Sequence, residues 1–419
     1  MRGRLRELKL PRDGIGPMVP VQTEDTPALR QKVYDCVRSC GRISRRDVAK
    51  RLAISPATVT NLVAELLEQG LLEEVETGTK RDRNRGRPPV ALKVRGEAGY
   101  VAGVMLSDEV HSGIILDYAG KAIADVAIPR RPGADVSLVD EAERVFLKLA
   151  MAAGIGMEQI DSLGLGLPGV VDNANGTILW SPIMQARNVP MAELLSARLG
   201  VPVEVDNDAN LVTLAELWYG AGRRVESFAV ITIENGLGMG LVTGHKLYRG
   251  THSAALELGH TKVQLDGALC RCGQRGCLEA YVADYALVRE ASVAMQQVRG
   301  KPVPAQVQLE SLYDQAKAGN EAARTIFRRA GRFLAVGLAN VISLFDPELI
   351  VLSGARMKFD YLYAEDVLNE TRQLAVDAGR NVPDIEINAW GGLVWARGAA
   401  TLALAAASAR RTARPEVVV

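Results

Sequence analysis

Three of the chain's five cysteines fall within eight residues, at Cys270, Cys272 and Cys277, and His260 lies ten residues before the first of them. Thiolates and an imidazole are typical ligands of tetrahedral zinc, and four protein ligands leave no open position for a reactive water. The spacing therefore predicts one structural zinc ion (Zn2+) per chain. The alternative is a reduced cysteine cluster that binds no metal.

Two acids flank this motif, Glu257 three residues before His260 and Glu279 two residues after Cys277. Carboxylates and an imidazole in fixed positions can accept hydrogen bonds from the many hydroxyl groups of a polyhydroxylated ligand. Both acids could equally support the metal ligands or lie exposed on the surface. The residues alone leave these interpretations open.

A second polar cluster, Asp206-Asn-Asp-Ala-Asn210, follows a predicted strand over 201–205 and precedes a predicted helix. Open α/β sheets bind ligands just beyond the carboxyl ends of their strands. Helix capping would use Asn207 or Asp208, but it does not need four polar residues. We therefore expect part of this cluster to contact a ligand.

The composition is that of an ordinary globular protein, with 48% hydrophobic and 24% charged residues in 419. No apolar run reaches the length of a membrane span, and no apolar segment follows the N-terminal arginines. Few, clustered cysteines indicate a reducing, cytoplasmic location. Charge is uneven: 20 Lys and Arg stand against 12 Asp and Glu up to residue 95, and 30 against 37 beyond it. This asymmetry favours a nucleic-acid-binding head on an acidic body.

Residues 28–95 show the pattern of a helix-turn-helix. Helical periodicity runs from Ala28 to Gly41, and Ser44 and Ser55 are N-caps of two further helices. The last helix presents a face of small, mostly polar side chains that can approach base edges in a major groove: Ser55, Ala57, Thr58, Thr60 and Asn61. Asn61 is a candidate adenine reader. The alternative is a helical hairpin with an exposed polar face.

Two predicted strands follow, over 71–75 and 90–94, joined by a basic segment that contains Gly86. A hairpin with such a tip is typical of a DNA-binding wing, in which Arg85 and Arg87 could enter a narrow minor groove. Residues 28–95 as a whole resemble the winged helix-turn-helix of MarR-like and related bacterial repressors.

Beyond Gly96, strands alternate with helices. Strands are predicted at 101–106, 113–117, 122–128, 163–167, 201–205, 228–233, 241–244 and 349–354, and helices at 138–153, 283–299, 308–318, 321–344 and 398–407. The glycine-rich segment 234–240 is expected to form a tight loop between two strands. This order predicts two α/β lobes with a cleft between them.

The body, residues 97–409, resembles the ROK family, which contains bacterial sugar kinases and sugar-responsive repressors. The matching segments are 164–169, 206–210, the glycines of 236–240, 257–260, the cysteine motif through Glu279, and 338–347. The resemblance implies the two-lobed actin-like ATPase (ribonuclease H-like) fold. It also implies sugar contacts at Asn207, Asp208, Glu257, His260 and Glu279, with His260 shared between sugar and zinc.

The resemblance leaves a choice between kinase and regulator. The family's first phosphate loop has the pattern Asp-x-Gly-Gly-Thr, and this chain has Met105-Leu-Ser-Asp-Glu109 in its place. Both glycines are gone, and Asp108 and Glu109 would repel a triphosphate. Asp208, which stands where the kinases have their general base, would then be vestigial. We therefore predict a transcriptional repressor that keeps the sugar site but lacks catalysis, with an ATP-dependent sugar kinase carrying a regulatory head as the alternative.

The predicted organisation is a flexible arm (1–27), a DNA-binding head (28–95), a body (97–409, zinc motif 257–279) and a tail (410–419). The expected partners are double-stranded operator DNA, a sugar or sugar phosphate, and further copies of the chain in a homodimer or tetramer. Closure of the cleft around sugar would change the spacing of two heads and lower DNA affinity.

Overall fold

A computed structural model describes ten stretches of the chain: 14–18, 28–76, 90–131, 137–251, 253–294, 305–354, 357, 365–376, 382–388 and 390–413. Contacts divide the chain into two compact units. Among the described residues, the first unit comprises those up to Glu226, Gly244–Lys246 and those from Leu393 onward, and the second comprises Ser227–Thr243 and those between Leu247 and Gly392. Among the described residues, no helix is both long and apolar enough to traverse a lipid bilayer.

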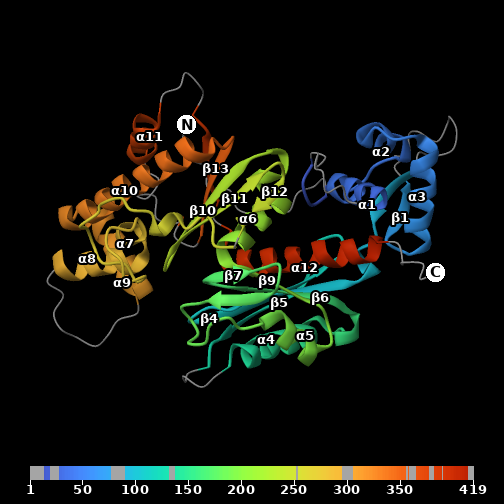
Figure 1. Ribbon diagram of the computed structural model, residues 1–419, viewed down its shortest axis with the longest axis horizontal. Helices are drawn as coiled ribbons and strands as arrows, with labels where there is room; N and C mark the ends of the chain where they lie inside the picture. The colour runs from blue at the N-terminus through green and yellow to red at the C-terminus, as the bar shows by residue number, and fades with distance from the viewer. Residues whose placement is uncertain are drawn as a thin grey trace. The chain divides into compact units, whose positions relative to one another are not determined.

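The head forms the predicted winged helix-turn-helix within the first unit (Figure 1). The Ser44 and Ser55 hydroxyls accept hydrogen bonds from the amides of Asp47 (3.2 Å) and Thr58 (3.1 Å), so both predicted N-caps are confirmed. Strand β1 pairs antiparallel with β2. The elements are α1 (Leu29–Cys40), α2 (Arg45–Leu52), α3 (Pro56–Glu68), β1 (Leu72–Glu76) and β2 (Val90–Val94). Arg85 and Arg87 lie outside the described residues.

A five-stranded sheet in the order β5-β4-β3-β6-β9 forms the centre of the first unit. Strands β3, β4 and β5 form an antiparallel meander, and β6 and β9 continue the sheet in parallel. The strands are β3 (Tyr100–Met105), β4 (Val110–Asp117), β5 (Ala122–Pro129), β6 (Ile160–Leu167) and β9 (Val203–Asn207). A separate hairpin pairs β7 (Val170–Asp172) with β8 (Thr177–Trp180).

Helices cover both faces of this sheet. Alternate residues of β3 point to opposite faces: Ala102 and Val104 join a buried cluster with α4 and α5, whereas Gly103 faces α12. A Cβ on Gly103 would lie 2.2 Å from the carbonyl oxygen of Ala396, so only glycine permits this approach. The helices are α4 (Leu138–Ala153), α5 (Met191–Leu199), α6 (Asp208–Tyr219) and α12 (Val394–Thr412).

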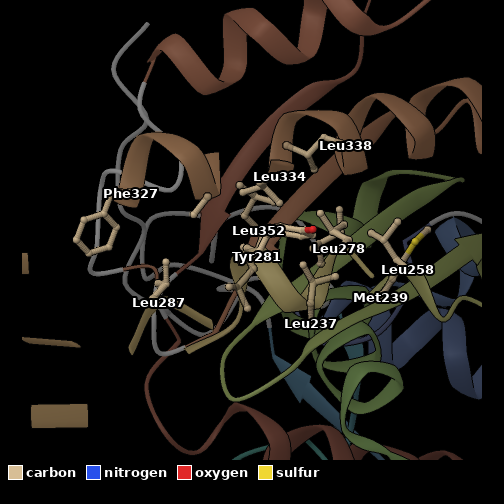
Figure 2. Packing of buried hydrophobic residues seen from close by; sticks show 14 of the residues in the cluster. Leu237, Met239, Leu258, Leu278, Tyr281, Leu287, Phe327, Leu334, Leu338 and Leu352 are labelled. Atoms are coloured by element: carbon tan, nitrogen blue, oxygen red, sulfur yellow. The ribbon is translucent and has the colours of Figure 1, made fainter. Parts of the chain in front are cut away.

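The second unit repeats this topology in the order β12-β11-β10-β13-β14. Its elements are β10 (Phe228–Ile233), β11 (Leu237–Thr243), β12 (Lys246–Tyr248), α7 (Glu279–Val282), α8 (Asp284–Ala294), α9 (Ala305–Lys317), α10 (Glu321–Phe345), β13 (Leu349–Ser353), α11 (Glu365–Leu374) and β14 (Asp384–Asn388). Figure 2 shows its buried cluster, in which Leu334 and Leu338 of α10 lie near Leu278, Tyr281 and Leu352. The repeated sheet confirms the predicted two-lobed α/β architecture.

Three predictions were wrong in detail. Residues 14–18 are not a flexible arm, because Ile15 is buried and the Gly16 amide donates to the carbonyl of Trp218 (2.9 Å). The glycine segment is not one loop: Gly238 and Gly240 belong to β11, and only 234–236 forms the turn. The last helix begins before residue 398 and continues through 410–412, which were assigned to the tail.

Candidate functional site

The predicted metal ligands converge at one point of the second unit. His260 ends the 3-10 helix Leu258–His260, and the cysteines lie on a loop held by isolated bridges between Lys262 and Cys277 and between Leu269 and Arg275. Their four ligand atoms all lie within 4.8 Å of one another. Positive φ angles at Gly273 (84°) and Gly276 (76°) allow the loop to turn.

The distances within this group fit a tetrahedral ion. The sulfurs of Cys272 and Cys277 are 3.7 Å apart, and the Cys270 sulfur is 3.6 Å from His260 Nδ1. Around an ion with Zn–S bonds of about 2.3 Å, a tetrahedral edge would measure about 3.8 Å. Three soft sulfurs and one imidazole nitrogen suit zinc better than a hard cation. The four residues could therefore hold a metal ion.

Glu279 lies directly beside this group. Its Oε1 is 3.6 Å from the Cys270 sulfur and accepts a hydrogen bond from the Tyr285 hydroxyl (3.2 Å), and its Oε2 accepts from the Leu237 amide (3.2 Å). Tyr285 was not anticipated, because it belongs to no motif. Two donors, the Tyr285 hydroxyl and the Leu237 amide, fix the Glu279 carboxylate next to a candidate metal ligand.

Glu257 approaches the other side of the imidazole, with its Oε2 3.9 Å from His260 Nε2. Desolvation raises the pKa of the Glu257 carboxyl, His260 opposes this rise, and the nearby Glu279 adds to it. The structure thus brings Glu257, His260 and Glu279 together, as the sequence predicted. His260 presents Nδ1 to the cysteines and Nε2 to the acid.

The second polar cluster caps a helix in the first unit. Asn207 Oδ1 accepts from the Asn210 amide (2.9 Å), and Asp208 Oδ1 accepts from the Ala209 amide (2.9 Å). The buried Asp206 accepts from the Asn210 side-chain amide (2.8 Å). Capping therefore occupies one oxygen each of Asn207 and Asp208, and both residues stay half-buried at the carboxyl end of β9.

The turn between β3 and β4, where the sequence departs from the kinase pattern, is fixed by its own hydrogen bonds. The Ser107 hydroxyl donates to the Val110 carbonyl (2.6 Å), and the Ser107 amide donates to His111 Nδ1 (3.1 Å). Asp108 and Glu109 are exposed. An amide that could have faced a phosphate is thus already bonded to a buried imidazole.

Behind this turn lies a buried ionic network centred on Glu141 of α4. His111 Nε2 is 3.0 Å from the Glu141 carboxylate, which also pairs with Arg144 (2.5 Å) and Arg131. Burial opposes ionisation of Glu141, but the hydrogen bonds from the two arginines outweigh it and hold its pKa at about 2. Burial lowers the pKa of His111, although Glu141 opposes that shift, so the imidazole can stay neutral and accept from Ser107.

The predicted DNA-reading face of α3 is accessible. Ser55, Ala57, Thr60 and Asn61 are exposed and Thr58 is half-buried, whereas Val59, Leu62, Val63 and Leu66 are buried against the head. Thr60 turns its hydroxyl to the Pro56 carbonyl (2.8 Å), so Asn61 is the freer hydrogen-bonding side chain.

Comparisons with known proteins agree with this geometry. The sequence model of the ROK family matches residues 142–406, and one described as winged helix-turn-helix DNA-binding matches residues 28–73. The xylose repressor of Caldicellulosiruptor bescii is 28% identical over 80% of this chain and 85% of its own length.

Two solved structures are also similar. A ROK family transcriptional regulator, described as a homolog of the Escherichia coli MLC protein, gives a TM-score of 0.75 at 26% identity and covers 91% of this chain and 96% of its own. A ROK family glucokinase from Streptomyces griseus, in complex with glucose and AMPPNP, gives a TM-score of 0.62 at 29% identity and covers 73% of this chain and 99% of its own.

The ionic network behind the turn generates a pH-dependent prediction. Glu141→Gln should cost about 3 kcal/mol at neutral pH, because removing one partner of a buried pair leaves uncompensated charge. Folding lowers the pKa of the Glu141 carboxyl from about 4.5 to about 2. Its contribution to the free energy of unfolding is therefore complete above pH 4.5 and is lost as the pH falls toward about 2. In thermal unfolding measured from pH 7 to pH 3, the difference in melting temperature between Glu141→Gln and wild type should become smaller below about pH 4.5. Glu143→Gln, which removes a partly exposed acid on the same helix, should cost at most about 1 kcal/mol.

Proposed function

This chain belongs to the ROK family, whose sequence model matches residues 142–406, and on that premise we propose that it is a transcriptional repressor controlled by a sugar or sugar phosphate. The observation that carries the proposal is a winged head with an exposed reading helix, joined to a family body whose first phosphate loop is replaced by a closed turn. A regulator needs the head, and a kinase needs the loop.

The head supports DNA binding. Small side chains at the start of α3 and the exposed amide of Asn61 suit a major groove, because an amide can donate to and accept from adenine at once. The xylose repressor of Caldicellulosiruptor bescii is similar along 80% of this chain. We therefore assign operator DNA as the partner of the head.

Sugar recognition is assigned to the carboxylates, amide and imidazole that match the family motifs: Asn207, Asp208, Glu257, His260 and Glu279. Acceptor side chains that hydrogen bonds already hold in place lose little conformational entropy when they bind a polyol. His260 would donate from one ring nitrogen to sugar and bind metal through the other, which fixes its tautomer.

Zinc is assigned to His260, Cys270, Cys272 and Cys277 as a structural ion. It would hold the loop that precedes Glu279 and fix the imidazole, and it has no chemical step to perform. Glu279, 3.6 Å from the Cys270 sulfur, would couple this support to the sugar contacts.

Absence of kinase activity is part of the proposal. The exposed acids Asp108 and Glu109 occupy the turn, and its Ser107 amide is bonded to His111. Phosphoryl transfer depends on groups that neutralise phosphate charge, and this turn offers the opposite charge. The likeness to a glucokinase keeps the kinase alternative worth testing.

The proposed response is a change of operator affinity. In a homodimer or tetramer, each head would read one half-site, so an altered position of the heads would break the match to the operator spacing. If sugar binds more tightly to one arrangement of the heads than to the other, it will shift the populations of the two arrangements.

Asn61→Ala should weaken operator binding by about 1–3 kcal/mol and relax preference for the base that Asn61 reads. Operator duplexes selected from random sequence, followed by titration against every single-base variant, would measure both effects. Glu68→Gln, a change at the far end of α3, should leave the base preferences intact. If Asn61→Ala binds with wild-type preferences, Asn61 does not read a base.

Purified protein should contain about one zinc per chain, measured by elemental mass spectrometry. Cys272→Ser should lose the metal and weaken the sugar response more than DNA binding, because it loosens only the sugar-contacting loop. Cys40→Ser, a matched thiol change outside the group, should keep both. A metal-free wild-type protein with a normal sugar response would refute the structural role.

One or more of D-xylose, D-glucose, N-acetyl-D-glucosamine and their phosphates should raise the melting temperature. A ligand at about 100 times its Kd stabilises the native state by about 2.7 kcal/mol. Asp208→Asn should abolish this shift, whereas Asp125→Asn, on the exposed face of β5, should not. The same sugars, incubated with radiolabelled ATP, should remain unphosphorylated. Efficient phosphate transfer would instead establish the kinase alternative.

A further inference from the structure

Helix α6 connects the two functional ends of the first unit. It begins at Asn207 and Asp208, and its last turn contains Trp218. Twelve residues at 1.5 Å each give a rod of roughly 18 Å. Nearly every residue of it is buried, and a Cβ on Gly398 would lie 2.0 Å from the Leu211 carbonyl oxygen, so α12 touches its backbone directly. A helix packed in this way moves as a rigid body rather than bending.

The far end of α6 is a docking point for the DNA head. The guanidinium of Arg38, on α1, lies over the Trp218 ring at 4.1 Å from its centroid, and its Nη2 pairs with Asp35 at 2.7 Å. Its Nη1 also reaches the Ser408 hydroxyl of α12 at 3.5 Å. Only 6% of Arg38 is exposed, which is unusual for an arginine.

Residues 14–18 tie the same two elements together. The Ile15 amide donates to the Arg38 carbonyl (3.1 Å), and the Gly16 amide donates to the Trp218 carbonyl (2.9 Å). The buried Arg223, just beyond α6, completes the junction with hydrogen bonds to the carbonyls of Gly16 (3.1 Å) and Ser39 (3.0 Å). The head is therefore fastened to α6 by a cation–π contact and backbone hydrogen bonds.

We propose that α6 is the element through which sugar acts on the head, and that Arg38 against Trp218 is the contact that transmits the signal. The inference rests on the proposed function, because it requires Asn207 and Asp208 to contact sugar. Helix shifts of about 1–2 Å are a known route for such transitions. The buried guanidinium packs against Trp218 while backbone hydrogen bonds through residues 15 and 16 join the same two helices, so a shift of α6 would displace α1, and with it the head.

The test compares operator affinity with and without sugar in the full-length protein. The probe is whichever of D-xylose, D-glucose, N-acetyl-D-glucosamine and their 6-phosphates (or xylose 5-phosphate) changes wild-type affinity most. Couplings of this kind change affinity about 5- to 150-fold. Arg38→Met keeps the apolar stem but removes the cation, and it should reduce the change to less than about twofold. Sugar should still raise its melting temperature, and operator DNA should still bind.

Three further variants make the result specific. Trp218→Leu removes the ring and should reduce the effect of sugar on operator affinity as much as Arg38→Met does. It therefore tests the same contact if Arg38→Met does not fold. Arg38→Lys should restore part of the response. Arg30→Met makes the same change at another buried arginine of α1, which pairs with Glu65 and Gln69 inside the head, and should keep the full response.

The outcomes separate the two ideas. A wild-type response in Arg38→Met and Trp218→Leu overturns the α6 pathway and leaves the sugar-controlled repressor standing. If Arg30→Met loses the effect of sugar on operator affinity to the same degree, the α6 pathway is also overturned, because any disturbance of the head would then abolish the response. If no probe changes wild-type affinity, the proposed function fails and this inference fails with it.

Discussion

Direct backbone contact between α12 and its neighbours is the constraint on which the first unit depends. Cβ atoms on Gly103 and Gly164 would lie 2.2 Å and 1.8 Å from carbonyl oxygens of α12, and one on Gly398 would meet α6. Glycines at these points let the C-terminal helix pack directly on two central strands and on α6. Layers packed this closely have few ways to rearrange except by movement of whole elements. The position of the head follows from it, since the head rests on α6 and α12.

The local features of the fold could be read from the sequence because they depend on neighbouring residues. Ser44 and Ser55 are recognisable as caps at short range, and the cysteine spacing indicates a shared ligand point before any coordinates are known. What escaped prediction depends on residues distant in the chain. Arg38 and Trp218 are separated by 180 positions, and nothing in either segment specifies the other.

Glycine was the least reliable signal. Gly238 and Gly240 were expected in a loop, yet they pair with Thr232 and Val230 inside the sheet. Residues 14–18 contain two glycines and a proline, which resembles a flexible arm, but Gly14 and Gly16 adopt positive φ in order to fit against the C-terminal end of α1. Glycine marks either a free backbone or a close approach, and only tertiary structure distinguishes the two.

Two features at the carboxyl end of the central sheet, one after β3 and one after the parallel strand β9, explain why a kinase-like fold can serve regulation. The carboxyl end of β9 keeps half-buried polar groups at the start of α6, which suits ligand binding. The turn after β3 is closed by Ser107 and held from behind by His111 and Glu141. The ionised Glu141 pairs with two arginines, and disrupting these pairs would leave a buried charge without a partner. Opening the turn toward a phosphate would therefore cost considerable free energy. In the repressor that we propose, sugar-binding energy at β9 would not be used for phosphoryl transfer and would remain available to move α6. The element that α6 contacts at its other end is the DNA head.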